Sequence, residues 1–468
     1  MFRKALVVVY PVLVILGLSL TAAAQSDRLL YSFCDQNPVC PDGAFPMATV
    51  MRDSVGNLYG TTYHGGGTAC NNGYGCGEVF ELSPYKATSG ANVVYTQKVL
   101  YRFPQAPGDG FSPEAGLVMD SAGNLYGTTA EGGLIGANGQ CEPYGCGTVF
   151  QLVRGDDGNW TENILWRFCS VANCADGISP TASLVFDAAG NLYGTAASGG
   201  TGPKPCPVGC GVVFELMRAA NGVWLEKVLH SFAFKEGAFP EGGVIFDAAG
   251  NLYGTTNSGG SGEFGTVFEL SPDGDQWTEQ VLYNFNGVIG RDPLTALAFD
   301  KNGNLLGTTF QGGNDTEICT YGCGIVFELT PNGNGQWSET TLYAFCPEGG
   351  IYCTDGAFPA SGLTLANDGS LYGTTGMGGS VGGGVIYKVT PSNGIYTEST
   401  VYSFPGDISG TSEGYEPAAG VIFDPAGNLY GTTELGGSSF NCNNGGGCGT
   451  VYMLTPEALG ERRLEVLK

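Results

Sequence analysis

A seven-residue core, Gly-Asn-Leu-Tyr-Gly-Thr-Thr, occurs seven times in this chain of 468 residues, complete or with one substitution. Successive copies start 53 to 67 residues apart. A recurring period of this kind indicates a repeat architecture, in which each unit is one supersecondary element and neighbouring units bury each other's faces. The copies begin at Gly56, Gly123, Gly190, Gly250, Gly303, Gly369 and Gly427.

Each unit predicts four short β-strands joined by tight turns. In the fourth unit these strands are "GGVIFD" at 242–247, "LYGTT" at 252–256, "GTVFEL" at 265–270 and "WTEQVLYNF" at 277–285. One such sheet cannot bury both of its faces alone, and seven sheets in one chain favour radial closure. We therefore expect an all-β fold, a seven-bladed β-propeller of four-stranded antiparallel blades, as a single domain over residues 25–468. A parallel β-helix is the competing fold, and the recurrent hairpin turns argue against it.

The stretch before each core, Asp-x-x-Gly-Asn, predicts the turn between the first and second strands. Glycine adopts positive φ at little cost, and aspartate accepts Asx hydrogen bonds from its own turn. The sixth copy has Ala366 in the aspartate position, so the turn does not require a charge. We expect the recurrent Tyr, Phe and Trp of each unit to pack blade against blade. The expected capping residues are Asp53, Asp120, Asp187, Asp247, Asp300 and Asp424.

The run G-N-L-Y-G-T-T-x-x-G-G followed by G-T-V-F-E-L resembles the GloVer (Gloeo/Verruco) repeat of secreted bacterial proteins, described as choice-of-anchor tandem-repeat proteins. The resemblance covers nearly the whole chain after residue 24. It implies export and a repeat array, and it assigns no activity. Family members often carry a C-terminal surface-anchor signal, which the final "ERRLEVLK" does not resemble.

Residues 1–24 have the pattern of a secretory signal peptide. Arg3 and Lys4 precede an apolar run from Ala5 to Leu20, and three alanines stand before the expected cleavage point. An uncleaved anchor is the alternative, but the run is short for a membrane span of about 20 residues. We expect export to the extracellular space, the cell surface or the periplasm, with no membrane insertion after cleavage.

Composition excludes several classes of protein. The formal net charge of −25 becomes −27 when Arg3 and Lys4 leave with the signal peptide, and such a chain repels nucleic acid and anionic lipid. Only 13% of residues are charged, whereas 79 are glycine, which excludes a helical bundle and a disordered tail. We expect a monomer with no nucleic-acid partner.

Two terminal segments resemble the fourth strand of a blade. "DRLLYSF" at 27–33 and "RRLEVLK" at 462–468 both match "EQVLYNF", and a closed ring has one vacancy. Because the N-terminal segment keeps the Tyr-x-Phe ending, we expect it to complete the last blade.

Sixteen cysteines form eight pairs of close sequence neighbours. In an exported chain the expectation is disulfides, whereas a metal site needs four converging ligands, commonly including His, and this chain has two His. All eight pairs fall in the connections that open on one face of a propeller. The expected pairs are Cys34–Cys40, Cys70–Cys76, Cys141–Cys146, Cys169–Cys174, Cys206–Cys210, Cys319–Cys323, Cys346–Cys353 and Cys442–Cys448.

We expect function on this disulfide-stapled face, because binding residues concentrate on differing loops held by a rigid scaffold. The two residues before each Gly-Gly vary between copies, and blades 7, 1 and 2 adjoin in a ring. An aromatic ring beside polar acceptors suits a carbohydrate, and ordinary surface variation is the alternative. The candidate ligand-binding residues are Tyr63, His64, Glu131, Phe310, Gln311 and Glu434.

Acidic residues also recur in the Asp/Glu-Gly-x-x-Pro loops that lead into the innermost strands. Several carboxylates crowded at the channel mouth would suit Ca²⁺, which takes several oxygen ligands. Turn chemistry and solubility are the alternative roles, and "GRDP" at 290–293 departs from the pattern. The candidate calcium ligands are Asp42, Asp109, Asp176, Glu236, Asp355 and Glu413.

The expected function is a binding or scaffold module for a glycan or a cell-surface protein. The alternatives are a polysaccharide lyase or glycoside hydrolase on the same face, and a structural repeat protein without a small ligand. Blade geometry puts Glu131 and Glu434 roughly 18 Å apart, whereas glycosidase carboxyl pairs lie about 5 to 9.5 Å apart. We assign no catalytic residue and no cofactor besides the calcium candidate.

Overall fold

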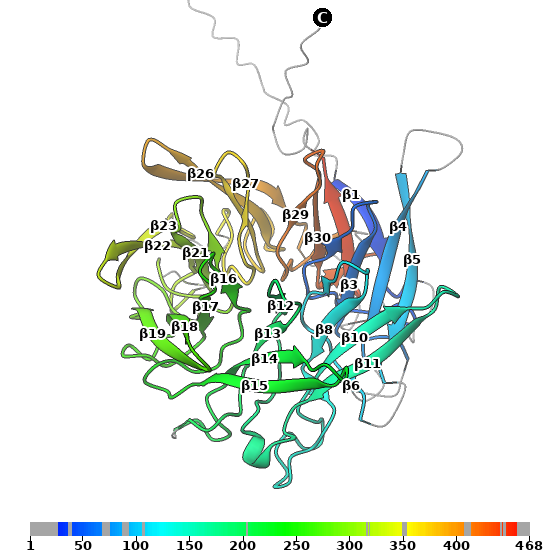
Figure 1. Cartoon of the computed structure of the whole chain (residues 1–468). Helices are drawn as coiled ribbons and strands as arrows, with labels where there is room; N and C mark the ends of the chain where they lie inside the picture. The colour runs from blue at the N-terminus through cyan, green and yellow to red at the C-terminus, as the bar shows by residue number, and fades with distance from the viewer. Residues whose placement is uncertain are drawn as a thin grey trace, which may run out of the picture.

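The computed structural model describes residues 27–35, 40–67, 75–86, 93–104, 108–202, 205–314, 317, 319–348, 353–406, 413–439, 442 and 446–455. Seven four-stranded antiparallel sheets stand as blades around a central axis, which confirms the predicted seven-bladed β-propeller (Figure 1). The expected signal peptide at 1–24 lies outside the described residues. Within the described part of the chain, no helix has the length and hydropathy needed to cross a membrane.

The blades follow chain order, with the shortest strand innermost. Blade 1 contains β2 (Met51–Arg52), β3 (Leu58–Thr62), β4 (Glu78–Lys86) and β5 (Val93–Arg102). Blade 2 contains β7 (Val118–Met119), β8 (Leu125–Thr129), β10 (Thr148–Arg154) and β11 (Trp160–Arg167). Blade 3 contains β12 (Val185–Phe186), β13 (Leu192–Ala196), β14 (Val212–Arg218) and β15 (Trp224–Ser231).

Blades 4 to 6 repeat this plan. Blade 4 contains β16 (Ile245–Phe246), β17 (Leu252–Thr256), β18 (Thr266–Asp273) and β19 (Gln276–Asn284). Blade 5 contains β20 (Ala298–Phe299), β21 (Leu305–Thr309), β22 (Ile325–Gly333) and β23 (Gln336–Ala344). Blade 6 contains β24 (Thr364–Leu365), β25 (Leu371–Thr375), β26 (Val385–Ser392) and β27 (Ile395–Ser403).

Blade 7 is built from both ends of the described chain. It contains β29 (Ile422–Phe423), β30 (Leu429–Thr433) and β32 (Thr450–Leu454), and its outer strand is β1 (Asp27–Ser32). β1 pairs antiparallel with β32, from Asp27 opposite Leu454 to Ser32 opposite Thr450. Figure 1 shows the blue β1 beside the brown and red strands of this blade. The N-terminal segment therefore closes the ring, as predicted.

Two short ribbons accompany the blades at their loop ends. β6 (Gly110–Phe111) pairs with β9 (Glu131–Gly132), and β28 (Gly414–Tyr415) pairs with β31 (Leu435–Gly436). Each ribbon joins the loop that leads into a blade to the loop that follows the second strand of the same blade. These pairings fix the two variable loops of a blade against each other.

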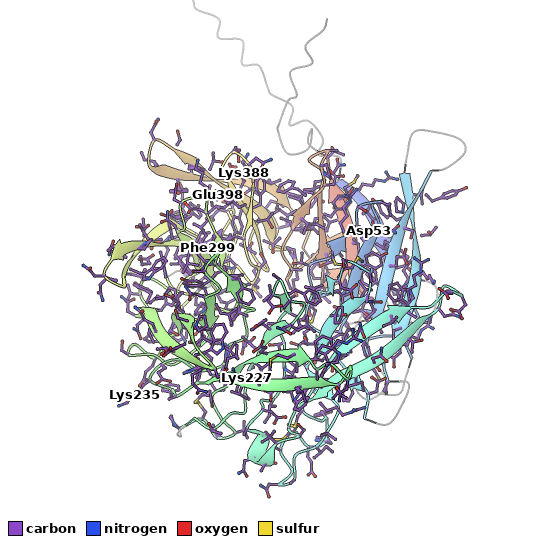
Figure 2. The ribbon with its side chains drawn as sticks, viewed as in Figure 1. Asp53, Lys227, Lys235, Phe299, Lys388 and Glu398 are labelled. Carbon is purple, nitrogen blue, oxygen red and sulfur yellow. A yellow bond between two sulfur atoms is a disulfide. The ribbon has the colours of Figure 1, made fainter. Side chains whose placement is uncertain are left out.

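The Asp-x-x-Gly-Asn turns form as predicted. The Asp53 carboxylate (labelled in Figure 2) accepts hydrogen bonds from the backbone N–H of Val55, Gly56 and Asn57 at 2.8 to 3.0 Å. Its second oxygen accepts the Asn57 amide at 2.8 Å and the Tyr59 hydroxyl at 3.3 Å. In the sixth copy, where Ala366 stands in the aspartate position, Asp368 is the acceptor of the turn and accepts the Ser370 N–H at 2.9 Å. The motif is structural.

Side chains fill the space between neighbouring sheets (Figure 2). The second strand of every blade is buried along its whole length. Its glycine permits a close approach, because a Cβ on Gly60 would lie 2.6 Å from Cζ of Phe80 on the adjoining strand. The recurrent tyrosine packs on the next blade, as Tyr253 does at 5.2 Å from Phe299 and 6.4 Å from Trp337.

A threonine hydroxyl links each blade to the next around the channel. Thr61 donates to the Ala115 carbonyl at 2.9 Å, and the corresponding threonine of each later blade repeats this bond. The bond from Thr432 in blade 7 to the Ala48 carbonyl, at 3.1 Å, completes the circle across 384 residues of sequence. The ring is thus closed at the channel as well as at its outer strand.

Seven of the eight predicted disulfides are present among the described residues: Cys34–Cys40, Cys141–Cys146, Cys169–Cys174, Cys206–Cys210, Cys319–Cys323, Cys346–Cys353 and Cys442–Cys448. Cys70, of the eighth pair, lies outside the described residues. The loops of adjoining blades bring some disulfides side by side. The Sγ atoms of Cys40 and Cys442 are 3.8 Å apart, and those of Cys323 and Cys353 are 3.7 Å apart.

Candidate functional site

A cavity of about 410 Å³ lies where the seven blades meet. Every blade contributes the segment that follows the proline of its entrance loop, and most of these residues are Ala, Gly, Ser or Thr. The residue directly after each proline lines the cavity: Met47, Glu114, Thr181, Glu241, Leu294, Ala360 and Ala418. Two glutamates therefore face an otherwise small and uncharged wall.

The residue directly before each proline has an unusual backbone. Its φ lies between +54° and +62° in all seven blades, a conformation that costs a non-glycine residue about 1–2 kcal/mol. This chain has 79 glycines, yet none of them occupies this position. Side chains are therefore retained here at an energetic cost. The seven residues are Phe45, Ser112, Ser179, Phe239, Asp292, Phe358 and Glu416.

The backbone of this residue ties three loops together. In blade 1, the Phe45 N–H donates to the Cys448 carbonyl of blade 7 at 2.8 Å, and the Phe45 carbonyl accepts the Tyr63 N–H at 3.0 Å. In blade 2, the Ser112 N–H and carbonyl make the same two bonds to Cys76 and Ala130. All seven entrance loops thus share one backbone geometry and differ in their side chains.

The loops of blades 1 and 2 bring together three of the predicted ligand-binding residues. We call Tyr63, His64, Ser112, Glu114 and Glu131 the mouth cluster. The rings of Tyr63 and His64 have centroids 4.4 Å apart, and the Ser112 hydroxyl donates to Glu131 Oε2 at 3.0 Å. The charges of Glu114 and Glu131 both act on Tyr63, which also hydrogen-bonds Ser112. Aromatic rings and carboxylate acceptors therefore share one side of the channel mouth.

Burial dominates the electrostatics of the mouth cluster. Burial and the charges of Glu131 and Glu241 raise the pKa of Glu114 to about 7. Burial also raises the pKa of Glu131, although the Ser112 hydrogen bond opposes this shift. The pKa of His64 is lowered by burial. Near neutral pH the cluster therefore combines a neutral imidazole with a carboxyl that is partly protonated.

The remaining predicted ligand-binding residues have other neighbours. Phe310 stacks on Phe358 of blade 6, with ring centroids 5.1 Å apart, and the Gln311 carbonyl accepts the Arg291 N–H at 3.0 Å. The Glu434 N–H donates to the Glu416 carbonyl at 3.0 Å, and burial together with the Glu416 charge raises the pKa of Glu434. The structure gives these three residues no contact with the mouth cluster among its described contacts.

Sequence reasoning missed Ser112 and Glu114. Both flank Pro113 in the entrance loop, whereas the candidate residues of the sequence analysis stand before Gly-Gly. Aligning the seven copies at the proline shows that the residues directly before and after it also vary between copies. Their contact with Tyr63 depends on adjoining blades, which the comparison of single units does not show.

The six candidate calcium ligands each pair with an aromatic residue on the outer strand of the preceding blade. Asp42 accepts the Tyr31 hydroxyl at 2.7 Å, and Asp355 accepts the Tyr343 hydroxyl at 2.8 Å. Among the described residues, no three carboxylates lie within 4.8 Å of one another. Calcium binding stays a prediction. The other four pairs are Asp109 with Tyr101, Asp176 with Trp166, Glu236 with His230, and Glu413 with Tyr402.

Several of these loop acids also lie beside a glutamate of their own blade's outer strand. In blade 2, the Tyr101 hydroxyl donates to Asp109 Oδ2 at 2.8 Å and to Glu162 Oε2 at 3.0 Å. Burial and the Asp109 charge raise the pKa of Glu162 to about 8. Burial and the Asp176 charge raise the pKa of Glu226 to about 8. Burial and the Glu236 charge raise the pKa of Glu279 to about 7, and burial and the Asp355 charge raise the pKa of Glu398 to about 7.

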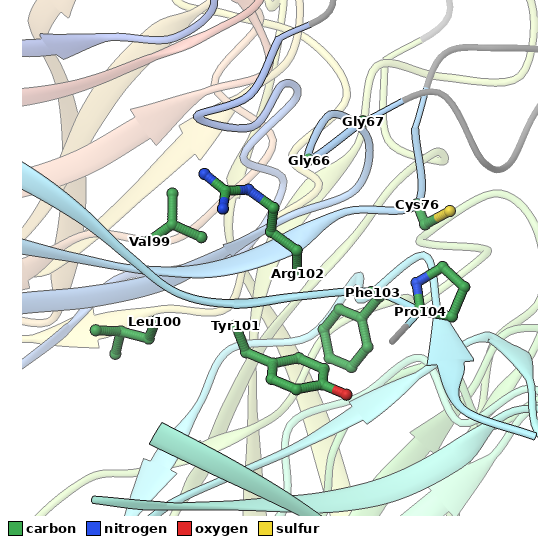
Figure 3. A pocket seen from close by; sticks show the side chains of 9 residues that line it. All are labelled: Gly66, Gly67, Cys76, Val99, Leu100, Tyr101, Arg102, Phe103 and Pro104. Atoms are coloured by element: carbon green, nitrogen blue, oxygen red, sulfur yellow. The ribbon is translucent and has the colours of Figure 1, made fainter. Parts of the chain in front are cut away.

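Another hollow, of about 320 Å³, lies against the outer strand of blade 1 (Figure 3). Arg102 and Tyr101 point to opposite sides of this strand, and Gly66 and Gly67 approach from the loop after β3. Residues 68–74 and 105–107, which follow Gly67 and Pro104 in the sequence, lie outside the described residues. We assign this hollow no function.

The family model of the Gloeobacter/Verrucomicrobia repeat matches residues 134–354 and 317–466, which together cover most of the chain. The chain belongs to the Gloeobacter/Verrucomicrobia repeat family. Membership confirms the resemblance found in the repeated core. Family membership and the described disulfides of this Gloeobacter/Verrucomicrobia repeat protein indicate an exported protein.

No curated protein matches the sequence of this Gloeobacter/Verrucomicrobia repeat protein. Among solved structures, it is similar to a fungal alcohol oxidase of the AA5 family in complex with copper, at 14% identity and a TM-score of 0.51, over 93% of this chain and 77% of that chain. A protein of unknown function from Dyadobacter fermentans matches at 12% identity and a TM-score of 0.43, over 81% and 97% of the two chains. At 14% identity the likeness to the alcohol oxidase shows the fold alone.

Proposed function

We propose that the mouth cluster binds a glycan, and that the protein is an exported binding module of the extracellular space, the cell surface or the periplasm. The observation that carries this proposal is the Tyr63–His64 ring pair beside Ser112, Glu114 and Glu131, near the channel cavity. A sugar ring offers an apolar face and several hydroxyl donors. Aromatic rings pack on the apolar face, and carboxylates accept hydrogen bonds from the hydroxyls.

The cost of the entrance-loop backbone supports a role for its side chains. Glycine would relieve the positive φ at Ser112 and Phe45, and the chain uses glycine at many other positive-φ positions. Phe45, Phe239 and Phe358 use this position to pack on the blade core. Ser112 instead donates its hydroxyl to Glu131, as a polar binding surface would use it.

A glycoside hydrolase or lyase at the mouth cluster is the second candidate. Glu114, with a pKa of about 7, lies within electrostatic reach of Glu131. A protonated carboxyl beside an ionised one is the arrangement that glycosidases use for a general acid and its partner. In that case Glu114 would donate the proton and Glu131 would be the ionised partner.

We expect saturable binding of at least one neutral polysaccharide by the mature, oxidised protein on a glycan array. The double variant Y63A/E131Q should weaken that binding about tenfold or more, equal to about 1.4 kcal/mol. Tyr85→Ala is the matched control, because Tyr85 is an exposed tyrosine at the opposite end of blade 1. Unchanged glycan binding by the double variant would contradict the proposal. Absence of binding to every glycan on the array would favour a protein partner or a structural role.

The same polysaccharides separate the two candidates. A binding module leaves them intact, whereas an enzyme releases soluble products, and Glu114→Gln then abolishes release. Each incubation is run in millimolar calcium and again in chelator, with the melting temperature recorded. An equal melting temperature in calcium and in chelator would contradict the prediction that the protein binds calcium.

A further inference from the structure

Three blade interfaces have the same aromatic triad on the face of the short turns. In blades 2, 3 and 4, the tyrosine of the second strand packs between a phenylalanine and a tryptophan of the next blade. Ring centroids are 4.9 to 5.2 Å apart for Tyr–Phe and 6.4 to 6.5 Å apart for Tyr–Trp. Phe299, labelled in Figure 2, is the phenylalanine of the triad between blades 4 and 5.

Between blades 5 and 6, all three members of the triad are smaller. Leu306 stands in the tyrosine position, Leu365 in the phenylalanine position and Tyr396 in the tryptophan position. Ala366 also replaces the capping aspartate of blade 6. These four departures from the repeat meet at one interface. A cavity of about 460 Å³ lies there, within the range of small-molecule pockets.

The cavity has an apolar wall, a polar wall and an open side. Leu306 is buried at 2% exposure, whereas Leu365 is 38% exposed at the rim. Leu306, Leu365, Leu371 and Tyr396 line the cavity together with Asp300 and Glu328. The space that a tyrosine ring occupies in blades 2 to 4 is therefore reachable from solvent.

The polar wall of the cavity contains the acceptor that a tyrosine hydroxyl uses elsewhere. In blade 3, the Tyr193 hydroxyl donates to Glu215 at 2.7 Å. Glu328 holds the same strand position in blade 5. Its Oε2 accepts the Tyr396 hydroxyl at 3.2 Å, and its Oε1 accepts the Asn304 amide at 2.9 Å and the Thr330 hydroxyl at 3.0 Å. A carboxylate has about four acceptor sites, so Glu328 can accept a further hydroxyl.

We propose that the cavity between blades 5 and 6 binds a phenolic ring, with its hydroxyl donating to Glu328. The ring takes the place of the tyrosine that blade 5 lacks and packs against Leu306, Leu365 and Tyr396. The ligand is a small phenolic compound or the tyrosine side chain of a peptide. This site lies on the face opposite the mouth cluster, so its test is independent of glycan binding.

The probe is p-cresol, titrated by calorimetry against the mature, oxidised protein. We expect one saturable site with a dissociation constant on the order of 1 mM or tighter, which is reasonable for so small a ligand. Leu306→Tyr fills the cavity with the protein's own ring and should weaken binding at least tenfold while raising the melting temperature. Leu365→Phe narrows the rim and should weaken p-cresol binding by the same factor. It replaces Leu306→Tyr as the test variant if that variant does not fold. Val55→Tyr is the control, because it adds a tyrosine to an exposed turn of blade 1 on the same face.

Two further probes identify the chemistry. Toluene lacks the hydroxyl and should bind at least tenfold more weakly than p-cresol. N-acetyltyrosinamide that binds more tightly than p-cresol assigns the site to a peptide, and weaker binding assigns it to a free phenolic compound. Absence of saturable p-cresol binding, equal binding of toluene, or full binding by both filled variants would overturn the proposal.

Discussion

A chain that lacks residues 25–33 should melt more than about 10 °C below the full mature protein, or fail to form a closed propeller. The deletion removes β1 and its ladder to β32, together with Phe33, which is fully buried and lies 5.1 Å from Phe80 of blade 1. Removing one buried phenylalanine side chain alone costs about 3–5 kcal/mol. It also exposes the edge of β32, which invites pairing with other chains.

Deleting residues 460–468, an equal length at the other end, is the matched control. These residues lie outside the described part of the chain, and we expect the melting temperature to change by less than about 2 °C. Differential scanning calorimetry of both deletions and of Phe33→Ala provides the comparison. A larger loss from the C-terminal deletion would show that ring closure at β1 is not the main contribution of the ends.

Raising the pH from 5 to 8 should lower the melting temperature by about 5 °C or more, given an unfolding entropy of about 2.1 cal/mol/K per residue. Burial raises the pKa of Glu162 and Glu226 to about 8, and the pKa values of Glu114, Glu279 and Glu398 to about 7. In the unfolded chain these carboxyls titrate near 4.5. Between 4.5 and 8 the folded state therefore binds more protons than the unfolded state.

The sign of this effect follows from linkage. The contribution of these glutamates is fully present below pH 4.5, and it is lost as the pH rises through 7 to 8. Each group changes the free energy of unfolding by at most about 1.4 kcal/mol per pH unit in this range, and by less at Glu279 and Glu398, because water screens partly exposed groups. The turn aspartates act oppositely at low pH, because hydrogen bonds hold the pKa values of Asp120, Asp247 and Asp424 below the usual range despite burial. Stability should therefore be greatest near pH 5.

The variant E226Q/E279Q tests the cause. Glutamine stays neutral at every pH, so the variant should melt above the parent at pH 8 and close to it at pH 5. Glu348→Gln, at an exposed position, is the control and should follow the parent at every pH. A parent melting temperature that is level or rises between pH 5 and 8 would contradict the account.

Local chemistry made most of the fold predictable from the sequence. The Asp-x-x-Gly-Asn turn and the Leu-Tyr-Gly-Thr-Thr strand are short-range signals, and Asp53 and Gly60 have the environments that such signals describe. Ring closure by β1 was predictable because "DRLLYSF" retains the Tyr and Phe that the blade interface buries. The disulfides were predictable from the close spacing of the cysteines in a chain expected to be exported.

The site was only partly predictable, because its contacts cross from one blade to the next. Variation between the copies indicates Tyr63 and His64 of blade 1 and Glu131 of blade 2. Ser112 and Glu114 complete the cluster from the entrance loop of blade 2, and their contact with Tyr63 crosses the blade interface. The loop acids illustrate the same limit. Asp42 bonds Tyr31 on the outer strand of blade 7, a contact that requires knowing which strand closes the ring.

The shared geometry of the entrance loops separates the frame of this protein from the side chains that its loops present. Each blade presents a side chain on the same hydrogen-bonded backbone, whether that side chain is Phe45, Ser112 or Asp292. Exchanging these side chains would change the loop face while the hydrogen-bonded backbone stays the same. Two members of the family can therefore be superimposable in their blades and bind unrelated ligands, so a ligand identified for one member should be carried to another only after its entrance-loop residues are compared.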